Sequence, residues 1–281
     1  MSQKMEKENA SVTITELVTR TGTSDSPFFK SPDAEGDAQD EVQQPAADDA
    51  GSPQSPVTGG GIVYIEDRLR EANMLVQGSD LSPVFADEYR RIKRPLLSNA
   101  FGKASPLMEK GNLILVTSSI PGEGKTYTAI NLALSIAHER DHTVLLVDCD
   151  DARHGASSAL GIDDKPGLVE ILEEDDFSVG DAILRTDIPE LCLVPAGKQH
   201  DFVTELLASQ KMSELVTEIG ARYDDRVIIF DGPPLLPTPQ TQVLTGLVGQ
   251  VVFVVEAGKT PQSVVEEALN MIPEEQATGL V

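Results

Sequence analysis

The stretch that decides the fold runs from Leu113 to Glu139 and reads LILVTSSIPGEGKTYTAINLALSIAHE. Its first part, Leu113 to Thr117, is almost entirely apolar, which predicts a strand buried on both faces. The following residues are rich in Ser and Gly and include a Pro, so they predict a tight loop. From Lys125 to Glu139, apolar residues recur at helical spacing. We therefore expect a strand, a loop and a helix to follow one another without interruption.

The loop in this stretch has the composition of a phosphate-binding loop. Glycines let backbone N–H groups turn toward phosphate oxygens, and the N-terminus of the following helix adds partial positive charge. Lys125 can reach the terminal phosphates of a nucleotide from a surface loop, and the Thr126 hydroxyl can bind Mg²⁺. Ser119 replaces the first glycine of the general G-x-x-x-x-G-K-[ST] pattern, so the match is to a relaxed form of it. An ordinary glycine-rich turn is the alternative, which the order of strand, loop and helix disfavours. The candidate nucleotide-binding residues are Pro121, Gly122, Glu123, Gly124, Lys125, Thr126 and Tyr127.

Further apolar runs alternate with helical segments along the chain. The predicted strands are Leu113–Thr117, Thr143–Asp148, Leu191–Pro195, Val227–Asp231, Gln250–Val255 and Gly279–Val281. The predicted helices are Ile62–Gln77, Lys125–Glu139, Val203–Tyr223 with a break inside it, and Pro261–Ile272. Apolar strands separated by helices form parallel sheets covered on both faces. The predicted fold class is therefore α/β, a P-loop NTPase fold with a mostly parallel sheet and helices on both faces.

Composition predicts two parts of unequal character. Residues 1–61 are rich in Ser, Pro, Asp, Glu, Gln and Gly, so we expect a disordered acidic arm before a domain at residues 62–281. The formal net charge of −24 disfavours binding to nucleic acid or to an anionic membrane surface. No apolar run is long enough to span a membrane, which favours a cytoplasmic protein. The chain ends in what looks like the start of a core strand, so we expect the natural chain to continue beyond Val281.

Acidic residues end two more of the predicted strands. Asp148 and Asp150 follow the run Val144–Val147, and Asp231 follows Val227–Phe230. In open α/β sheets, ligands bind beyond the carboxyl ends of the strands, where these side chains would gather around the phosphate-binding loop. One strand-end pair of acids is often only solvated. Three acids around one such loop favour a magnesium and phosphoryl-transfer site.

The motifs together resemble those of the bacterial tyrosine kinases. Pro121–Thr126 is similar to their Walker A motif, the segment ending at Asp150 with Arg153 after it to their A′ motif, and Phe230–Pro234 to their Walker B motif. Glu88–Arg94 resembles the E-x-x-R-x-x-R pattern of the same family. The amino-acid sequence around these motifs is similar to that of the exopolysaccharide-associated autokinases of the family. The resemblance spans roughly the last two hundred and twenty residues.

This resemblance implies a role for each matching residue. The family uses ATP and Mg²⁺ to phosphorylate protein tyrosine, in the regulation of exopolysaccharide synthesis or export. Catalytic roles fall to Lys125, Asp148 and Asp150, with Asp148 as the candidate acceptor of the tyrosine proton, although Asp148 and Asp150 could exchange roles. Magnesium ligands would be Thr126, Asp150 and Asp231, directly or through water.

The resemblance also implies assembly. Glu88, Arg91 and Arg94 would meet a neighbouring subunit in a ring-shaped homo-oligomer, whereas the alternative is a solvated, charged helix face. The family further implies a membrane partner, a chain-length co-polymerase that would hold the chain at the inner face of the membrane.

The sequence departs from the family in its tyrosines. The family ends in a tyrosine cluster, whereas this sequence contains only Tyr64, Tyr89, Tyr127 and Tyr223. Packing is the expected role of Tyr89 and Tyr127. His154, beside Arg153, could approach the nucleotide, but a catalytic role for it is disfavoured.

Two other functions remain possible from the sequence. One is a positioning or partition ATPase of the MinD/ParA type, although the signature lysine near the start of its loop is absent from Ser118–Pro121. The other is a nucleotide-responsive scaffold that assembles but transfers no phosphate.

Overall fold

The computed structural model describes residues 61–76, 83–102, 105, 108–150, 155–274 and 276–281. The predicted disordered arm lies outside the described residues except for Gly61, as do Arg153 and His154.

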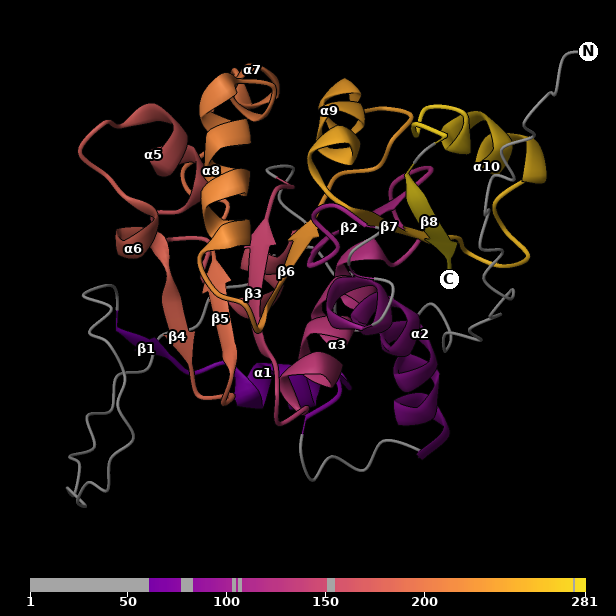
Figure 1. The fold of residues 1–281 in the computed structure, drawn as a ribbon, viewed down its shortest axis with the longest axis horizontal. Coiled ribbons are helices and arrows are strands. Elements are labelled where there is room, and N and C mark those ends of the chain that lie inside the picture. The colour runs from indigo at the N-terminus through magenta and orange to yellow at the C-terminus, as the bar shows by residue number, and fades with distance from the viewer. Residues whose placement is uncertain (1–60, 77–82, 103–104, 106–107, 151–154, 275) are drawn as a thin grey trace, which may run out of the picture.

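An eight-stranded sheet runs through the molecule, in the order β1-β4-β5-β3-β6-β2-β7-β8 (Figure 1). Its strands are β1 (Ile62–Val63), β2 (Leu113–Ser118), β3 (Thr143–Asp148), β4 (Leu184–Thr186), β5 (Leu191–Val194), β6 (Arg226–Asp231), β7 (Gln250–Val254) and β8 (Ala277–Leu280). Neighbouring strands pair in parallel except β4 and β5, which are antiparallel. The prediction of a mostly parallel α/β sheet is confirmed.

Helices cover both faces of this sheet. They are α1 (Glu66–Glu71), α2 (Pro83–Phe101), α3 (Lys125–Ala137), α4 (Ala156–Leu160), α5 (Leu168–Glu173), α6 (Val179–Ala182), α7 (Val203–Leu207), α8 (Gln210–Ala221), α9 (Pro239–Leu247) and α10 (Gln262–Leu269). Figure 1 shows α2 and α3 in its lower half and α7, α8 and α9 in its upper half.

Alternation along the central strands divides the core in two. In β2, Ile114 and Val116 pack with α1, α2 and α3, whereas Leu113 and Leu115 pack with α8, α9 and α10. The same division recurs in β3 and β6, because successive side chains of a strand point to opposite faces. Each of these strands is therefore apolar over nearly its whole length, which made it recognisable in the sequence.

The structure differs from the predicted elements at the amino end. The segment predicted as one helix, Ile62–Gln77, forms β1 and then the short helix α1. Asp187, just after β4, accepts hydrogen bonds from the backbone N–H of Ile65 (2.9 Å) and of Glu66 (3.2 Å) at the start of α1. Because Asp187 caps α1 at this position, the helix begins several residues later than the periodicity indicates.

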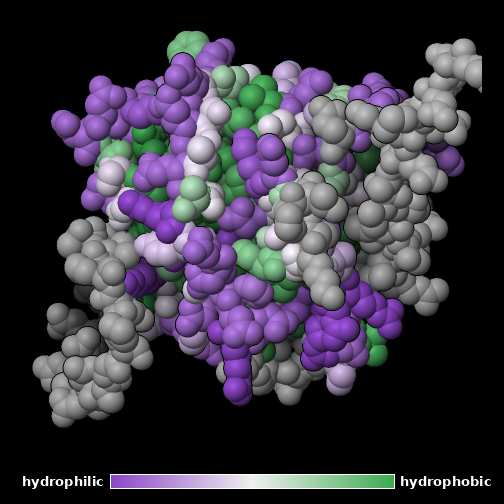
Figure 2. Space-filling model, in the orientation of Figure 1, coloured by the Kyte–Doolittle hydropathy of each residue, from purple (hydrophilic) through white to green (hydrophobic). Residues whose placement is uncertain are grey.

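The visible surface of the described residues is mainly polar, since on the face seen in Figure 2 these residues are mostly hydrophilic. No helix within the described ranges is long and apolar enough to cross a membrane.

Candidate nucleotide-binding and catalytic site

The phosphate-binding loop joins the end of β2 to the start of α3. Gly122 and Gly124 have φ of 92° and 91°, and a Cβ atom added to either would meet nothing within 4 Å. The backbone conformation, and not crowding, therefore requires glycine at both positions. Gly124 is the N-cap of α3, so the unpaired N–H groups and the partial positive charge of a 13-residue helix meet at the loop.

Lys125 is buried beside this loop rather than exposed. Its side chain forms an ion pair with Asp150, and both side chains are almost fully buried. The Lys125 ammonium also lies 3.5 Å from the Thr126 hydroxyl. Burial by itself lowers the pKa of Lys125, but the charges of Asp231, Asp150 and Asp148 raise it above its ordinary value. The expectation of a surface-loop lysine is wrong, because three acidic side chains keep this lysine charged inside the site.

Asp148 is held in place by backbone N–H groups. Its Oδ1 accepts from the N–H of Asp150 (3.0 Å) and its Oδ2 from the N–H of Ser157 (2.7 Å). Burial raises the pKa of Asp148 to about 6, against the opposing effect of these hydrogen bonds. A carboxylate with a pKa near neutrality is suited to accept a proton. Asp148 and Asp150 thus differ in their surroundings, since only Asp150 is paired with the lysine.

Asp231 ends β6 beside the same cluster. Its Oδ2 accepts from the N–H of Ala156 (3.1 Å), while its Oδ1 is buried and has no hydrogen-bond partner among the described residues. Burial raises the pKa of Asp231 to about 8, although Lys125 and a hydrogen bond with Thr126 act in the opposite direction. Buried polar atoms are normally paired, so an unpaired carboxylate oxygen marks a position that fits a cation or a water molecule.

The residues present fit a magnesium ion bound together with phosphate. Mg²⁺ in nucleotide sites takes one or two carboxylates and completes its shell with water and phosphate oxygens. Asp231, Asp150 and the Thr126 hydroxyl supply ligands of this kind. Among the described residues no group of three or more His, Cys, Asp or Glu side chains could hold a metal alone.

Two features of the site were not predicted. The first is the start of α4, where the N–H groups of Ala156 and Ser157 donate to Asp231 and Asp148. Gly155 precedes them, and a Cβ atom there would lie 2.4 Å from Asp148 Oδ1. Only glycine therefore allows this approach. Gly155 in the sequence was the one available signal.

The second feature is the role of the Glu123 side chain. Glu123 was predicted only as a nucleotide-binding residue, and its carboxylate ties the phosphate-binding loop to the loop after β7. Glu123 is 6% exposed. Its Oε2 accepts from the N–H of Ile120 (2.8 Å). Its Oε1 accepts from the Thr260 hydroxyl (2.6 Å) and the N–H of Glu256 (3.4 Å). Thr260 and Glu256 lie more than 130 positions away in the sequence, so local patterns could not reveal these two partners.

The remaining predicted site residues lie on the periphery. The Tyr127 hydroxyl donates to the carbonyl oxygen of Asn73 (2.9 Å), so this side chain joins α3 to the segment after α1. On α2, Glu88 is half-buried, and Arg91 and Arg94 are exposed. Within the described part of the chain, none of these three α2 residues forms an ion pair.

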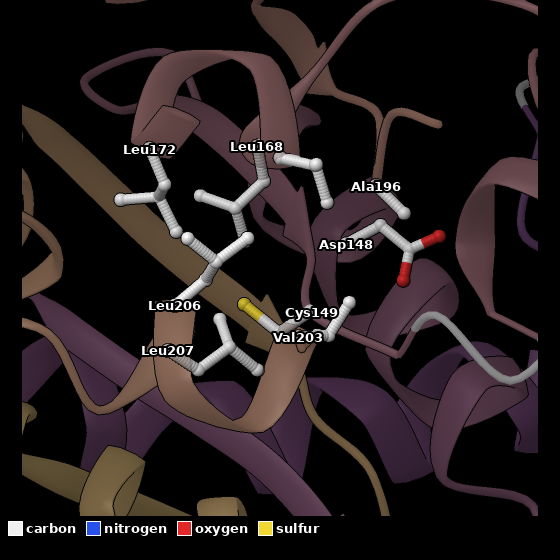
Figure 3. Close-up of a pocket in the computed structure, with 9 residues that line it drawn as sticks. Asp148, Cys149, Leu168, Leu172, Ala196, Val203, Leu206 and Leu207 are labelled. Carbon is white, nitrogen blue, oxygen red and sulfur yellow. The ribbon is translucent and has the colours of Figure 1, made fainter. Parts of the chain in front are cut away.

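A small cavity lies next to Asp148 but is not the nucleotide site. Its volume is about 10 Å³, which is at the limit for one water molecule. It is lined mainly by apolar side chains of α5 and α7, and Figure 3 shows the Asp148 carboxylate pointing away from Leu172, Leu206 and Leu207. A nucleotide would instead lie along the open phosphate-binding loop.

A glycine-rich loop, a buried lysine and three strand-end aspartates define the class of this protein as a nucleotide-binding α/β protein of the P-loop type. The chain belongs to the AAA domain family, whose model matches residues 111–276. It is 34% identical over 147 residues to the tyrosine-protein kinase YwqD of Bacillus subtilis (strain 168), a match that covers 52% of this chain and 60% of YwqD.

Two further relatives extend the comparison. The succinoglycan biosynthesis transport protein ExoP of Rhizobium meliloti (strain 1021) is 29% identical over 197 residues, covering 67% of this chain and 23% of ExoP. The crystal structure of the VpsO kinase domain superposes with a TM-score of 0.59 at 29% identity, covering 70% of this chain and 93% of that domain. The chain thus spans 60% or less of the length of the first curated relatives that it matches.

Proposed function

We propose that this chain transfers the γ-phosphoryl group of ATP to protein tyrosine and thereby regulates exopolysaccharide synthesis or export. One observation carries the proposal: Lys125 lies buried among Asp148, Asp150 and Asp231 at the phosphate-binding loop. Relatives named as tyrosine-protein kinases and as a succinoglycan transport protein support it.

The chemistry asks little of the protein beyond charge and position. Lys125 neutralises the terminal phosphates, and the N–H groups of the loop orient them. Asp148, fixed by two backbone N–H groups, accepts the proton of the tyrosine hydroxyl. Asp150, Asp231 and Thr126 would hold Mg²⁺. The ion would supply further neutralisation of the negative charge that develops on the phosphate oxygens.

Assembly and location follow from the same relationship. We infer that Glu88, Arg91 and Arg94 contact a neighbouring copy in a ring. A membrane-embedded chain-length co-polymerase would then place the ring at the inner face of the membrane.

The test is incubation of the purified chain with MgATP, followed by detection of phosphotyrosine on the chain and on a Glu–Tyr copolymer. Asp231→Asn is the informative variant, because its amide oxygen can still accept from Ala156 while the second ligand oxygen is lost. Asp148→Asn is less informative, since both Asp148 oxygens accept backbone hydrogen bonds. Asp175→Asn is the matched control, because the Asp175 side chain is fully exposed.

We expect phosphotyrosine with the parent chain and with Asp175→Asn, and none with Asp231→Asn. Orthophosphate release without phosphotyrosine would instead favour an ATPase. Nucleotide binding with neither product would favour the scaffold.

A further inference from the structure

The structure separates the four tyrosines of the sequence by their accessibility. Tyr89 is 3% exposed and its ring packs edge-on against Phe85, with centroids 5.2 Å apart. Burial raises the pKa of Tyr89 above its ordinary value. The Tyr127 hydroxyl is already engaged as a donor to the carbonyl oxygen of Asn73. Tyr89 cannot present its hydroxyl to another protein without unpacking α2 from the core, and Tyr127 cannot do so without losing its hydrogen bond to Asn73.

Two tyrosines reach the surface, to different extents. Tyr223 is 37% exposed, and the Arg226 guanidinium lies 4.0 Å from the centroid of its ring, which covers one face. Tyr64 is 81% exposed, which makes it the most exposed large hydrophobic or aromatic side chain among the described residues. A tyrosine that accepts phosphate must enter an active site, so it has to be accessible. Tyr64 is the more accessible of the two tyrosines.

The topology places Tyr64 far from the active site of its own chain. It follows β1, which pairs in parallel with β4, and β4 runs antiparallel to β5 and hence to β3. The carboxyl end of β1 therefore lies at the end of the sheet opposite Asp148. β3 has six residues, and a strand rises about 3.3 Å per residue, so the two ends are roughly 20 Å apart. Figure 1 shows β1 at the outer edge of the sheet, three strands away from β3.

We propose that Tyr64 is a phosphorylation site of this chain and that a second copy of the chain phosphorylates it. The inference rests on the proposed kinase function and adds the acceptor residue to it. The Tyr64 hydroxyl oxygen of one copy forms a bond to the γ-phosphorus of ATP held by the other copy. The bond between that phosphorus and the β–γ bridging oxygen breaks, and ADP leaves. The phenolic proton passes to Asp148 of the copy that holds the ATP.

The position suits an acceptor for a second, structural reason. Ile65, the next residue, is 1% exposed, and its N–H is fixed by Asp187. The backbone is therefore anchored immediately after an exposed side chain. An anchored backbone lowers the entropic cost of presenting that side chain to a partner site.

The experiment compares Tyr64→Phe with Tyr223→Phe in the full chain. Each is incubated with MgATP and a Glu–Tyr copolymer, and phosphotyrosine on the chain is located by mass spectrometry. We expect Tyr64→Phe to lose phosphorylation of the chain while it still phosphorylates the copolymer. We expect Tyr223→Phe to behave as the parent chain does. The removed hydroxyl is exposed in Tyr64→Phe, so the fold is preserved.

Transfer between copies is tested by mixing. Asp231→Asn serves as an acceptor that cannot phosphorylate itself, and Tyr64→Phe serves as the donor. Phosphate should appear on Tyr64 of the Asp231→Asn chain only in the mixture.

The outcomes separate this inference from the proposed function. Copolymer phosphorylation together with phosphate on Tyr223, or on no tyrosine of the chain, would overturn the assignment of Tyr64 and leave the kinase in place. Phosphorylation of neither the chain nor the copolymer would overturn both.

Discussion

Because Lys125 is ion-paired with Asp150, this carboxylate and the nucleotide phosphates compete for the same lysine. In the absence of nucleotide, Asp150 neutralises the lysine that the phosphates need. The same carboxylate is a candidate ligand for the magnesium ion that accompanies them. Asp150 would thus serve both as the ion-pair partner of Lys125 and as a ligand of the metal.

Asp150→Asn should strengthen nucleotide binding in the absence of magnesium and reduce the effect of magnesium on that binding. Without the metal, ADP binding should strengthen by about tenfold, or 1.4 kcal/mol, because the carboxylate that is ion-paired with Lys125 is removed. With magnesium, the gain in affinity that the ion normally provides should shrink. Titration calorimetry in EDTA and in MgCl₂ measures both effects, and Asp175→Asn is again the control. Weaker binding of ADP in EDTA would contradict the competition.

Glu123 supports a prediction about a single hydrogen-bonded cluster. Its two oxygens accept from Ile120 on one side and from Thr260 and Glu256 on the other. Hydrogen bonds to a charged group contribute about 1.5–3 kcal/mol each, so Glu123→Ala should lower the free energy of unfolding by roughly 2 kcal/mol or more. Thr260→Val removes one donor to this carboxylate and should cost about 1.5 kcal/mol. Urea unfolding measures both.

The double variant separates a shared cluster from two independent sites. Because the Thr260 hydroxyl contacts Glu123 directly, Glu123→Ala with Thr260→Val should cost little more than Glu123→Ala alone. Thr260→Ser keeps the hydroxyl and should resemble the parent chain. Additive losses would show that Glu123 does not join the two loops energetically.

At the scale of elements, α2 has two faces with different expected roles. Lys93 is 5% exposed, donates to the carbonyl oxygen of Ser135 in α3, and forms an ion pair with Glu139 at 2.6 Å. Arg91 and Arg94, two residues before it and one after it, are exposed. Within α2, Lys93 therefore packs against α3, whereas Arg91 and Arg94 lie exposed on the surface.

Substitutions on the two faces should have different effects. Lys93→Ala should lower the free energy of unfolding by about 2 kcal/mol, because a buried charge-assisted hydrogen bond and the packing of the lysine stem are lost. Arg91→Ala with Arg94→Ala should change it by no more than about 0.5 kcal/mol, as is usual for surface positions. The arginine variant should instead lower the oligomeric mass. Thermal unfolding and light scattering check both. Unchanged mass would show that these arginines are only solvated.

A helix or strand could be predicted from the sequence where its burial in the fold leaves an apolar pattern in its own residues. The central strands β2, β3, β6 and β7 are buried on both faces, so each is apolar and was found within a residue or two. β1 and β4 have two and three residues, too few to show a period. They pair with each other across more than 120 positions, and only the tertiary structure brings them together.

The site, too, could be predicted from the sequence only in part. The sequence predicted four site residues because each belongs to a motif: Lys125, Asp148, Asp150 and Asp231. The structure places them together at one end of the sheet. Their hydrogen-bond partners were not predicted, since backbone N–H groups carry no sequence signature. That Lys125 is buried was also missed, because its burial depends on acids from two other strands.

At the scale of the whole molecule, the segment before residue 111 completes the core. The family model begins at residue 111, yet one face of the sheet is covered by side chains that precede it. They include Ile65, Leu69, Met74, Tyr89, Ile92 and Leu96, each 8% exposed or less. Burying one such side chain stabilises a protein by about 1.5–3 kcal/mol, so the six together contribute roughly 10 kcal/mol.

A fragment that lacks the segment before the family match should therefore fail to fold. The net stability of a domain is about 5–15 kcal/mol, which the loss of these side chains would largely remove. We expect residues 108–281 to bind hydrophobic dyes and to lack a cooperative thermal transition, whereas residues 61–281 should unfold cooperatively. The matched control removes the other edge: residues 61–276 lack only β8, which is half-exposed to exposed, and should keep the transition. Cooperative unfolding of residues 108–281 would show that β1, α1 and α2 are an accessory layer and not part of the core.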